Sequence, residues 1–375
     1  MLDRAKLAKE LQSVANTLFV DCSGEYTIAR DIWQRIADDP TLCYRVRDLE
    51  TPLSVPTWEG KLSTITTIEP METYHVLSVD GSQIYPDRHQ GPSCFLINTG
   101  SVALHYGNAT QKVILRSQPY VFSAHDDHDL HLSTDLVNCR RQEFELRVGL
   151  QQALEMKQTM IDDALFVLLF DGSLIFWLLE AKERELKDHF LSIYLALLNQ
   201  LHEEKILVAG YISLPKSKEL VNIVRLALHN FDAAAAVTAE PTITHVLDAT
   251  IAHFFLKPFE RSIVFKNNAA ISEQYPDHLR AHFFYVHVGT EVGRVEIPAW
   301  IARDAQLVDD VARVLVDQCA KGGGYPIAIA EAHEQAVVKG PDRDFFYHLL
   351  TKMSMERQHQ LSVSQKSMHK RRIGI

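Results

Sequence analysis

Two aspartates occur in matching sequence contexts. The segment SVDGSQIY at 78–85 carries Asp80 and LFDGSLIF at 169–176 carries Asp171, each after an apolar run typical of a buried strand. We expect both aspartates at the ends of neighbouring strands, directly before a tight turn made by the DGS sequence. Two such carboxylates repel each other unless a cation lies between them, and their oxygens suit Mg²⁺ and Mn²⁺. The alternative is that each aspartate only caps its own turn.

A third carboxylate is expected from the helix predicted over 133–159, which lies between the two aspartates in the sequence. Glu143 falls in the apolar stripe of this helix, together with Leu146 and Leu150. Because an unpaired buried carboxylate is costly, metal coordination would give Glu143 a reason to be there. Glu145 lies on the flank of the stripe and is the second candidate. For either residue, the alternative is a partly exposed Glu in a charged helix.

A fourth candidate group lies in the segment GGGYPIAIAEAHEQAVV at 322–338, which carries Tyr325 and His333. If a helix begins after Pro326, the two residues are separated by just over two turns and can face one site. A histidine with a purely structural role fits the same pattern equally well.

The segment AHDDHDLH at 124–131 forms a competing candidate site. A helix would place its three histidines on one line, with aspartates between them, and such a cluster could bind zinc or another transition metal; the residues are His125, Asp126, Asp127, His128, Asp129 and His131. The alternative is a solvated acidic loop, since no apolar framework surrounds the cluster. The sequence has no GxxxxGK[ST], GxSxG or CxxC motif, which argues against a P-loop, a hydrolase serine elbow and a zinc ribbon.

The elements that position these residues follow an informative order. Apolar runs predict three antiparallel strands at 74–80, 93–99 and 101–107, followed by alternating helices and strands; these are helix 133–159, strand 164–170, helix 175–202, strand 204–213 and a helix to about 229. This is the order of an α/β fold with a ribonuclease H-like core and a mixed sheet. A Rossmann fold would alternate from the start.

We predict one main domain with appended segments. These are an N-terminal helical segment at 1–50, a turn-rich linker at 51–72, the main domain at 73–358 with an insertion at about 231–260, and a basic tail at 359–375. A hairpin is predicted from 283–289 and 293–298, and helices at 299–320, 326–338 and 343–358.

Charge and composition limit the function classes. Lys and Arg number 38 and Asp and Glu 48, so the net charge is −10, which argues against binding nucleic acid by bulk attraction. A nuclease stays possible because metal-binding carboxylates add negative charge. The apolar run at 164–181 has Asp171 near its centre, so we expect a buried strand and no membrane span. The five scattered cysteines and the charged N-terminus favour the cytoplasm.

Four segments together, VDGSQIYPDRH, FDGSLIF, GRVEIP and GYPIAIAEAHEQAVV, resemble the NurA nucleases over about residues 74–350. The resemblance implies a ribonuclease H-like core, a homodimer, Mn²⁺ as cofactor with Mg²⁺ usually poorer, and a HerA-like hexameric ATPase as partner. It implies that Asp80 and Asp171 are metal-binding aspartates and that a helical glutamate, Glu143 or Glu145, lies between them. Tyr325 and His333 match the late tyrosine and histidine of the family. Lys216 matches a basic position after the strand at 204–213.

The expected activity is metal-dependent hydrolysis of DNA phosphodiesters during double-strand break end resection and repair. The expected form is a 5′–3′ exonuclease that also cuts single strands internally. His333 would orient water or bind metal, Tyr325 would position a phosphate or stack on a base, and Lys216 would neutralise backbone charge. We expect dimerisation through the 283–298 hairpin and the N-terminal helices. The alternatives are a catalytically silent adaptor of a DNA-translocating ATPase and a phosphoesterase that uses the cluster from His125 to His131.

Overall fold

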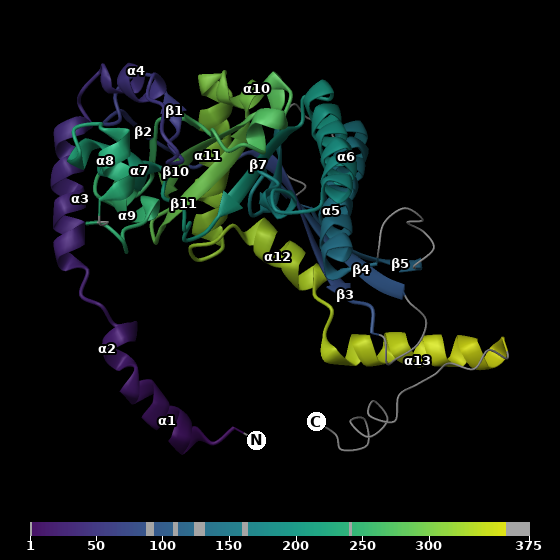
Figure 1. Cartoon of the computed structure of the whole chain (residues 1–375). Coiled ribbons are helices and arrows are strands. Elements are labelled where there is room, and N and C mark those ends of the chain that lie inside the picture. Colours follow the sequence, from purple (N-terminus) through teal and green to yellow (C-terminus); the bar gives the residue numbers. More distant parts are fainter. Residues whose placement is uncertain are drawn as a thin grey trace.

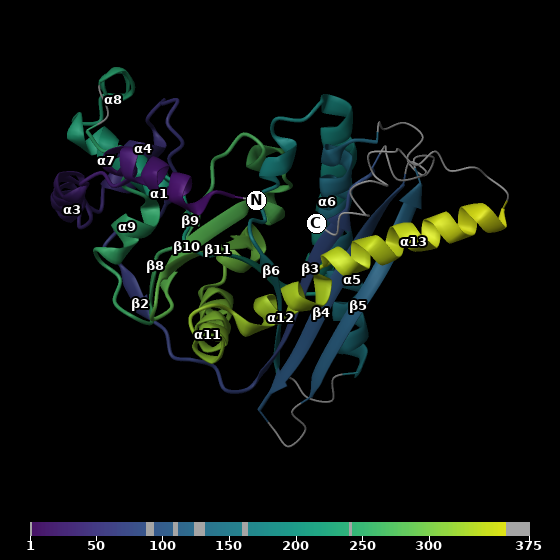
Figure 2. The same ribbon diagram turned by 90° about the horizontal axis from the view of Figure 1, so that it is seen from below.

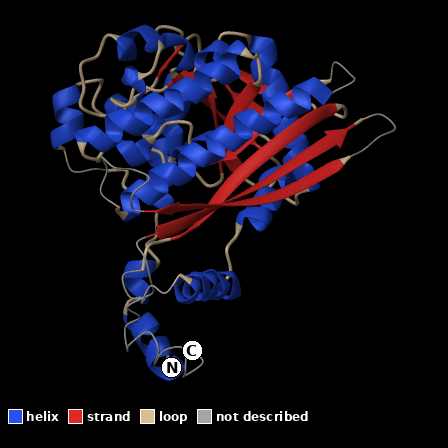
Figure 3. Cartoon of the chain, turned by 90° about the vertical axis from the view of Figure 1, so that its right-hand side faces the viewer, coloured by secondary structure: helices blue, strands red, loops and turns tan. Residues whose placement is uncertain are grey.

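The chain forms one large mixed sheet with helices on both faces (Figures 1 and 3). The computed structural model describes residues 2–87, 94–107, 112–123, 132–159, 164–239 and 242–357. The strands are β1 (Thr57–Trp58), β2 (Ile65–Thr67), β3 (Tyr74–Ile84), β4 (Cys94–Tyr106), β5 (Val113–Ser123), β6 (Leu165–Asp171), β7 (Leu207–Ile212), β8 (Glu260–Ser262), β9 (Phe265–Lys266), β10 (Ala281–His287) and β11 (Val292–Pro298).

The described part of the chain also contains α-helices. They are α1 (Arg4–Ser13), α2 (Ala15–Leu18), α3 (Ser23–Ile36), α4 (Leu42–Arg47), α5 (Thr134–Thr159), α6 (Arg184–Glu203), α7 (Glu219–Leu228), α8 (Ala233–Thr238), α9 (Asp248–His253), α10 (Ala299–Ala302), α11 (Ala305–Lys321), α12 (Ile327–Ala336) and α13 (Gly340–Glu356). Three short 3₁₀ helices, Trp177–Leu179, Ser272–Gln274 and Asp277–Leu279, complete the described elements.

The centre of the sheet combines antiparallel and parallel strands. Its order is β1-β9-β10-β11-β7-β6-β3-β4-β5, with β3 antiparallel to β4 and parallel to β6, and β6 parallel to β7. Residues 167–170 of β6 are all buried, as expected for an apolar run covered on both faces. The predicted mixed α/β sheet, with three antiparallel strands before the helix-linked strands, is present.

One strand prediction is wrong. Residues 93–99 and 101–107 do not form two strands, because β4 runs without a break through Gly100 and pairs with β3 and β5 along its length. The third antiparallel strand is β5, which the sequence patterns did not reveal. Gly100 allows close packing of α12, since a Cβ there would lie 2.2 Å from the backbone nitrogen of Ala336. Gly100 therefore marks a close contact between β4 and α12, and it does not mark a turn.

Helices α5 and α6 pack against each other beside β3, β4 and β5, and α11 and α12 lie on the other side of the sheet (Figure 2). A second core joins α3, α4, α7 and α9 to β9 and β10. The segment at 51–72 contributes to this body, because its strands β1 and β2 pair with β9 and β8.

The expectation that the 283–298 hairpin offers a free edge for assembly is wrong. Strands β10 and β11 are paired on both sides, with β9 and β7 as outer neighbours, and their side chains are buried. Helices α1 and α2 extend away from the body (Figure 1), and they expose Leu7, Leu11 and Leu18. They are the part of the predicted assembly surface that stays available.

Two further sequence expectations can be compared with the structure, and a third cannot. All five cysteines are unpaired. Among the described residues, no helix combines the length and apolar character needed to cross a membrane. The cluster from His125 to His131 and the basic tail at 359–375 lie outside the described residues.

Candidate active site

The two aspartates lie side by side on neighbouring parallel strands. Val79 of β3 is in register with Phe170 of β6, so Asp80 and Asp171 are the next pair along the two strands. The expected turn after Asp80 is absent, because β3 continues to Ile84 and stays paired with β4 there. Asp171 does end its strand, and Gly172 follows with a φ of +102° that favours glycine. The two DGS sequences therefore have different conformations but bring their aspartates together.

Of the two candidate glutamates on α5, Glu145 is the one next to the aspartates. Its carboxylate lies against Gly81, where a Cβ would be 2.8 Å from Oε1, and it accepts a 2.9 Å hydrogen bond from Arg141. The preference for Glu143 is corrected by its contacts. Glu143 is buried, as the stripe predicted, but its carboxylate is occupied by Arg140 and by Arg147, the latter at 2.6 Å.

Gly81 explains how α5 comes so close to the strand. Side chains alternate across a sheet, so Gly81 is the residue that faces α5, and its missing side chain lets the Glu145 carboxylate approach close enough for both aspartates to affect it. Arg141 also donates to the carbonyl of Gly81 at 3.1 Å. A side chain at position 81 would collide with both Arg141 and Glu145. Arg141 was not singled out by the sequence patterns, and its position four residues before Glu145 is the signal that would have indicated the pair.

The carboxylates are held in an environment that disfavours several negative charges at once. Burial raises the pKa of Glu145 to about 8; Arg141 opposes this shift, while Asp80 and Asp171 add to it. Burial also raises the pKa of Asp171, and the hydrogen bond from Tyr325 partly offsets the effect. Groups of this kind favour a bound cation, because a cation removes both the repulsion and the penalty for ionisation.

Tyr325 and His333 both reach the aspartates, as the helical spacing predicted. The Tyr325 hydroxyl donates to Oδ1 of Asp171 at 2.8 Å, and Nδ1 of His333 lies 2.8 Å from Oδ2 of Asp80. The Asp80 side chain is 13% exposed and that of His333 is 57% exposed, so the site is open to solvent on the histidine side.

The position of α12 is fixed by polar contacts at its C-terminal end. The carbonyl of Ala336 accepts hydrogen bonds from Asn98 at 2.8 Å and from the hydroxyl of Ser82. These contacts satisfy a backbone group that a helix end otherwise leaves unpaired. Together with the close approach at Gly100, they hold His333 over Asp80.

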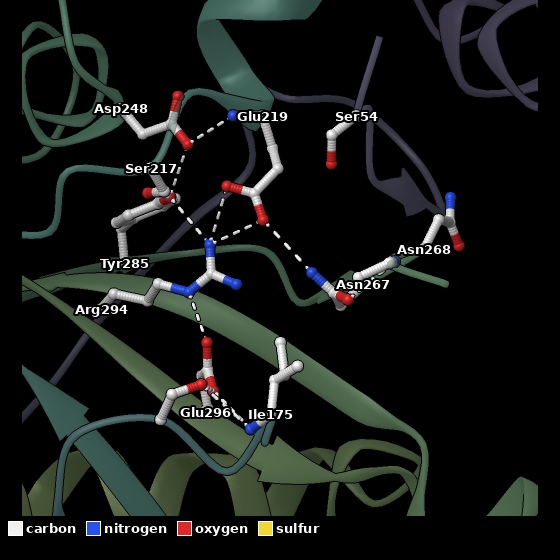
Figure 4. Close-up of polar contacts among 12 residues, drawn as sticks. Ser54, Ile175, Ser217, Glu219, Asp248, Asn267, Asn268, Tyr285, Arg294 and Glu296 are labelled. Atoms are coloured by element: carbon white, nitrogen blue, oxygen red, sulfur yellow. Dashed lines mark hydrogen bonds and ion pairs between the residues drawn. The ribbon is translucent and has the colours of Figure 1, made fainter. Parts of the chain in front are cut away.

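A buried ion-pair network fixes the turn that follows Asp171 (Figure 4). Glu296 of β11 accepts hydrogen bonds from Ser173 Oγ at 2.6 Å and from the backbone nitrogen of Leu174 at 3.0 Å. Arg294 links Glu296 to Glu219, with N–O distances of 2.8 and 3.0 Å. The sequence patterns identified 293–298 only as a strand; an Arg and a Glu on the same face of a buried strand were the available signal.

Lys216 follows β7, as the sequence predicts, and its side chain is exposed. It makes no hydrogen bond or ion pair with another residue in the described part of the chain. It lines a hollow of about 460 Å³ that also includes Gly172 and Ser173, directly beside Asp171. Within the described residues, Lys216 is therefore an unpaired cation in the same hollow as the turn that follows Asp171.

The donor set of this site fits a hard divalent cation. Carboxylate oxygens from Asp80, Asp171 and Glu145, with one imidazole from His333, are ligands that Mg²⁺ and Mn²⁺ accept. No three of these groups have donor atoms within 4.8 Å of one another; in the described ranges only Cys22, Glu25 and His245 do. With the side chains as they stand, one ion would therefore contact at most two of these groups directly, and binding by all three carboxylates requires a rotamer change or a bridging water.

Comparison with known proteins identifies the family. A NurA domain model matches residues 74–338, which include Asp80, Glu145, Asp171, Tyr325 and His333. No curated protein sequence matches the chain.

Solved structures give weaker likenesses. A NurA crystal structure with manganese has 10% identity and a TM-score of 0.41, covering 86% of this chain and 95% of that chain. A NurA structure bound to dAMP and manganese has 11% identity and a TM-score of 0.33, covering 82% and 91%. Thermus thermophilus RuvC, solved in complex with a Holliday junction substrate, has 14% identity and a TM-score of 0.18, covering 48% and 91%. The assignment rests on the family model, which spans more than two thirds of the sequence: the chain belongs to the NurA family of nucleases.

Proposed function

We propose that this protein is a metal-dependent DNA nuclease with a ribonuclease H-like core. One observation carries the proposal: Asp80 and Asp171 lie side by side on parallel strands, with the carboxylate of Glu145 beside them. The manganese in two family structures, and the dAMP in one, support Mn²⁺ as the cofactor and DNA as the substrate. Mg²⁺ is the expected weaker substitute.

Asp80, Asp171 and Glu145 are the proposed ligands. When bound, one or two cations would lower the pKa of a water molecule and stabilise charge on the phosphate oxygens. Arg141 holds Glu145 in place, and its positive charge limits the repulsion among the carboxylates. Glu143 is assigned a structural role, since two arginines already occupy its carboxylate.

His333 and Tyr325 serve the substrate side of the site. With Nδ1 bound to Asp80, the exposed His333 ring has Nε2 available to accept a proton from the attacking water. The Tyr325 hydroxyl orients Asp171 and would position the phosphate next to it. Lys216 would neutralise a phosphate next to the scissile one.

The family suggests how the enzyme is used. We propose that it acts as a homodimer with a HerA-like hexameric ATPase in 5′–3′ end resection during DNA repair, and that it also cuts single strands internally. The exposed apolar stripe of α1 and α2 supplies a surface for assembly. The unpaired cysteines fit a reducing cytoplasm. A silent adaptor is disfavoured because the chain keeps a full set of carboxylates, and a phosphoesterase at His125–His131 stays a separate possibility for testing.

The test is a titration of Mn²⁺ against end-labelled linear and single-stranded DNA, with Asp80→Ala and Glu143→Gln in parallel. We expect cleavage that rises with Mn²⁺, no cleavage by Asp80→Ala, and retained cleavage by Glu143→Gln. An inactive wild-type protein would support the adaptor. Metal-dependent cleavage that survives Asp80→Ala would place the chemistry elsewhere, such as the His125–His131 cluster.

A further inference from the structure

A hollow beside the Asp171 turn has the features of a binding site for a flat aromatic ring. It has a volume of about 460 Å³, within the roughly 300–1,000 Å³ range of small-ligand pockets. One wall is the turn at Gly172 and Ser173, and another is the segment 215–218 after β7. A Cβ built on Gly172 would meet no atom within 4 Å, so the space beside the turn is open.

Trp177 lines this hollow and is unusually exposed for a tryptophan. Its side chain has 43% of its surface accessible, whereas Trp33 and Trp58 are almost fully buried. The residue begins a 3₁₀ helix six positions after Asp171. The exposed part of the Trp177 indole does not contribute to core packing. It can serve as a stacking surface close to the strand end that carries Asp171.

The floor of the hollow is held by buried ion pairs. Arg294 and Glu296 line it and belong to the buried network of Figure 4, in which Arg294 bridges Glu296 and Glu219. Because Glu296 also binds Ser173 and the nitrogen of Leu174, the floor and the turn wall are held by the same carboxylate. The cavity is therefore preformed, which lowers the cost of ordering a ligand in it.

The rim of the hollow carries the positive charge of Lys216, which can attract the phosphate of a nucleotide. Lys216 is exposed and has no partner among the described residues, while neighbouring Lys218 donates to the carbonyl of Thr244 at 2.7 Å. A base held against Trp177 would share the hollow with Lys216, which can contact its phosphate, and with the turn that directly follows Asp171. Aromatic stacking combined with a nearby cation is the usual way to hold a single-stranded nucleotide.

We infer that this hollow is a nucleobase subsite, in which Trp177 stacks on the base of a single-stranded DNA nucleotide flanking the scissile phosphate. The inference rests on the proposed nuclease function for its substrate class. Stacking accepts any base, so the subsite would favour single strands and frayed ends over paired duplex without selecting a sequence. It thereby gives Trp177 a role in positioning the strand for cleavage.

The test measures binding without cleavage, in EDTA and at low salt. The probes are a fluorescein-labelled dT decamer and a decamer of abasic sites with the same charge, followed by anisotropy. The wild-type protein should bind the dT decamer more tightly than the abasic one. Trp177→Ala should reduce this affinity ratio by at least about fivefold, the lower end of the stacking contribution of one base, and Trp177→Phe should keep most of it. Trp300→Phe, at a half-buried tryptophan in a different hollow, is the matched control and should leave the ratio unchanged.

An unchanged affinity ratio in Trp177→Ala, with wild-type thermal stability, would overturn the subsite. Its failure is distinct from failure of the nuclease proposal, because no cleavage is needed here. A ratio that collapses in a protein without nuclease activity would support the subsite and reject the enzyme. If the wild-type protein cleaves DNA but Trp177→Ala leaves the affinity ratio unchanged, the nuclease proposal would be supported and the subsite rejected.

Discussion

Replacing Glu145 by Gln should change how the stability of the metal-free protein depends on pH. The pKa of Glu145 is raised from 4.5 to about 8 by burial and by Asp80 and Asp171. A carboxyl group whose pKa is raised in the folded state stabilises the fold at low pH, and this contribution is lost as the pH rises through the folded pKa. The affected window therefore runs from about pH 4.5 to about pH 8.

The size of the effect follows from the two pKa values. Between pH 6 and pH 8 the linkage relation gives a loss of about 2 kcal/mol in the free energy of unfolding from this one group. In a chain of this length that is about 3 °C in Tm. Glu145→Gln cannot ionise, so the variant should lack this part of the loss. Relative to the wild type, it should gain stability as the pH rises.

The assay is thermal unfolding in EDTA at pH 6 and pH 8, followed by circular dichroism. Glu143→Gln is the matched control, two residues away on the same helix. Its carboxylate is paired with Arg140 and Arg147, so removing it should destabilise the protein to a similar extent at both pH values. The reasoning is refuted if Glu145→Gln and the wild type lose stability in parallel between pH 6 and pH 8.

Four further outcomes are expected. Asp80→Ala should abolish cleavage while leaving the circular dichroism spectrum unchanged, and its Tm in EDTA should stay level or rise because a repelling carboxylate is gone; retained cleavage would reject its role. Tyr325→Phe should raise the pKa of Asp171 further, so Mn²⁺ affinity measured by calorimetry should fall more at pH 6 than at pH 8; an equal fall at both would argue against the hydrogen bond. Glu296→Gln should lower cleavage and Mn²⁺ affinity together, since the turn after Asp171 loses its charged acceptor; unaffected metal affinity would remove Glu296 from the site. Gly100→Ala should destabilise the fold by several kcal/mol, because its Cβ would lie 2.2 Å from the α12 backbone; a Tm within 1 °C of wild type, about 1 kcal/mol or less for this length, would contradict that packing.

The strands that carry the site were predictable because they are apolar on both faces. The run at 164–170 has no polar position until Asp171, so both the strand and its end follow from composition. Strand β5 could not be found this way. Its residues are mostly exposed, and it is held by backbone pairing with β4, a long-range contact that leaves little local pattern.

Sequence spacing predicted the positions of several candidate side chains but not which glutamate of α5 faces the strands. Helical spacing brought Tyr325 and His333 to the same site, because Tyr325 lies just before α12 and His333 lies about two turns further along, on the same side. The choice between Glu143 and Glu145 failed because burial was taken as the sign of a ligand. The buried charge of Glu143 is compensated by two arginines on its own helix. Glu145 instead reaches the site through the space left by the missing side chain of Gly81. Which glutamate faces the strands depends on that tertiary contact and not on the stripe.

The central claim is that Asp80, Asp171 and Glu145 hold the catalytic cation. The most direct measurement is anomalous diffraction at the manganese edge from crystals of the full chain grown with Mn²⁺. The account predicts a peak within coordination distance of carboxylate oxygens of Asp80 and Asp171, with Glu145 the third protein ligand and Glu143 still bound to its arginines. A peak only at Cys22, Glu25 and His245, or no peak near Asp80 in an active preparation, would contradict it.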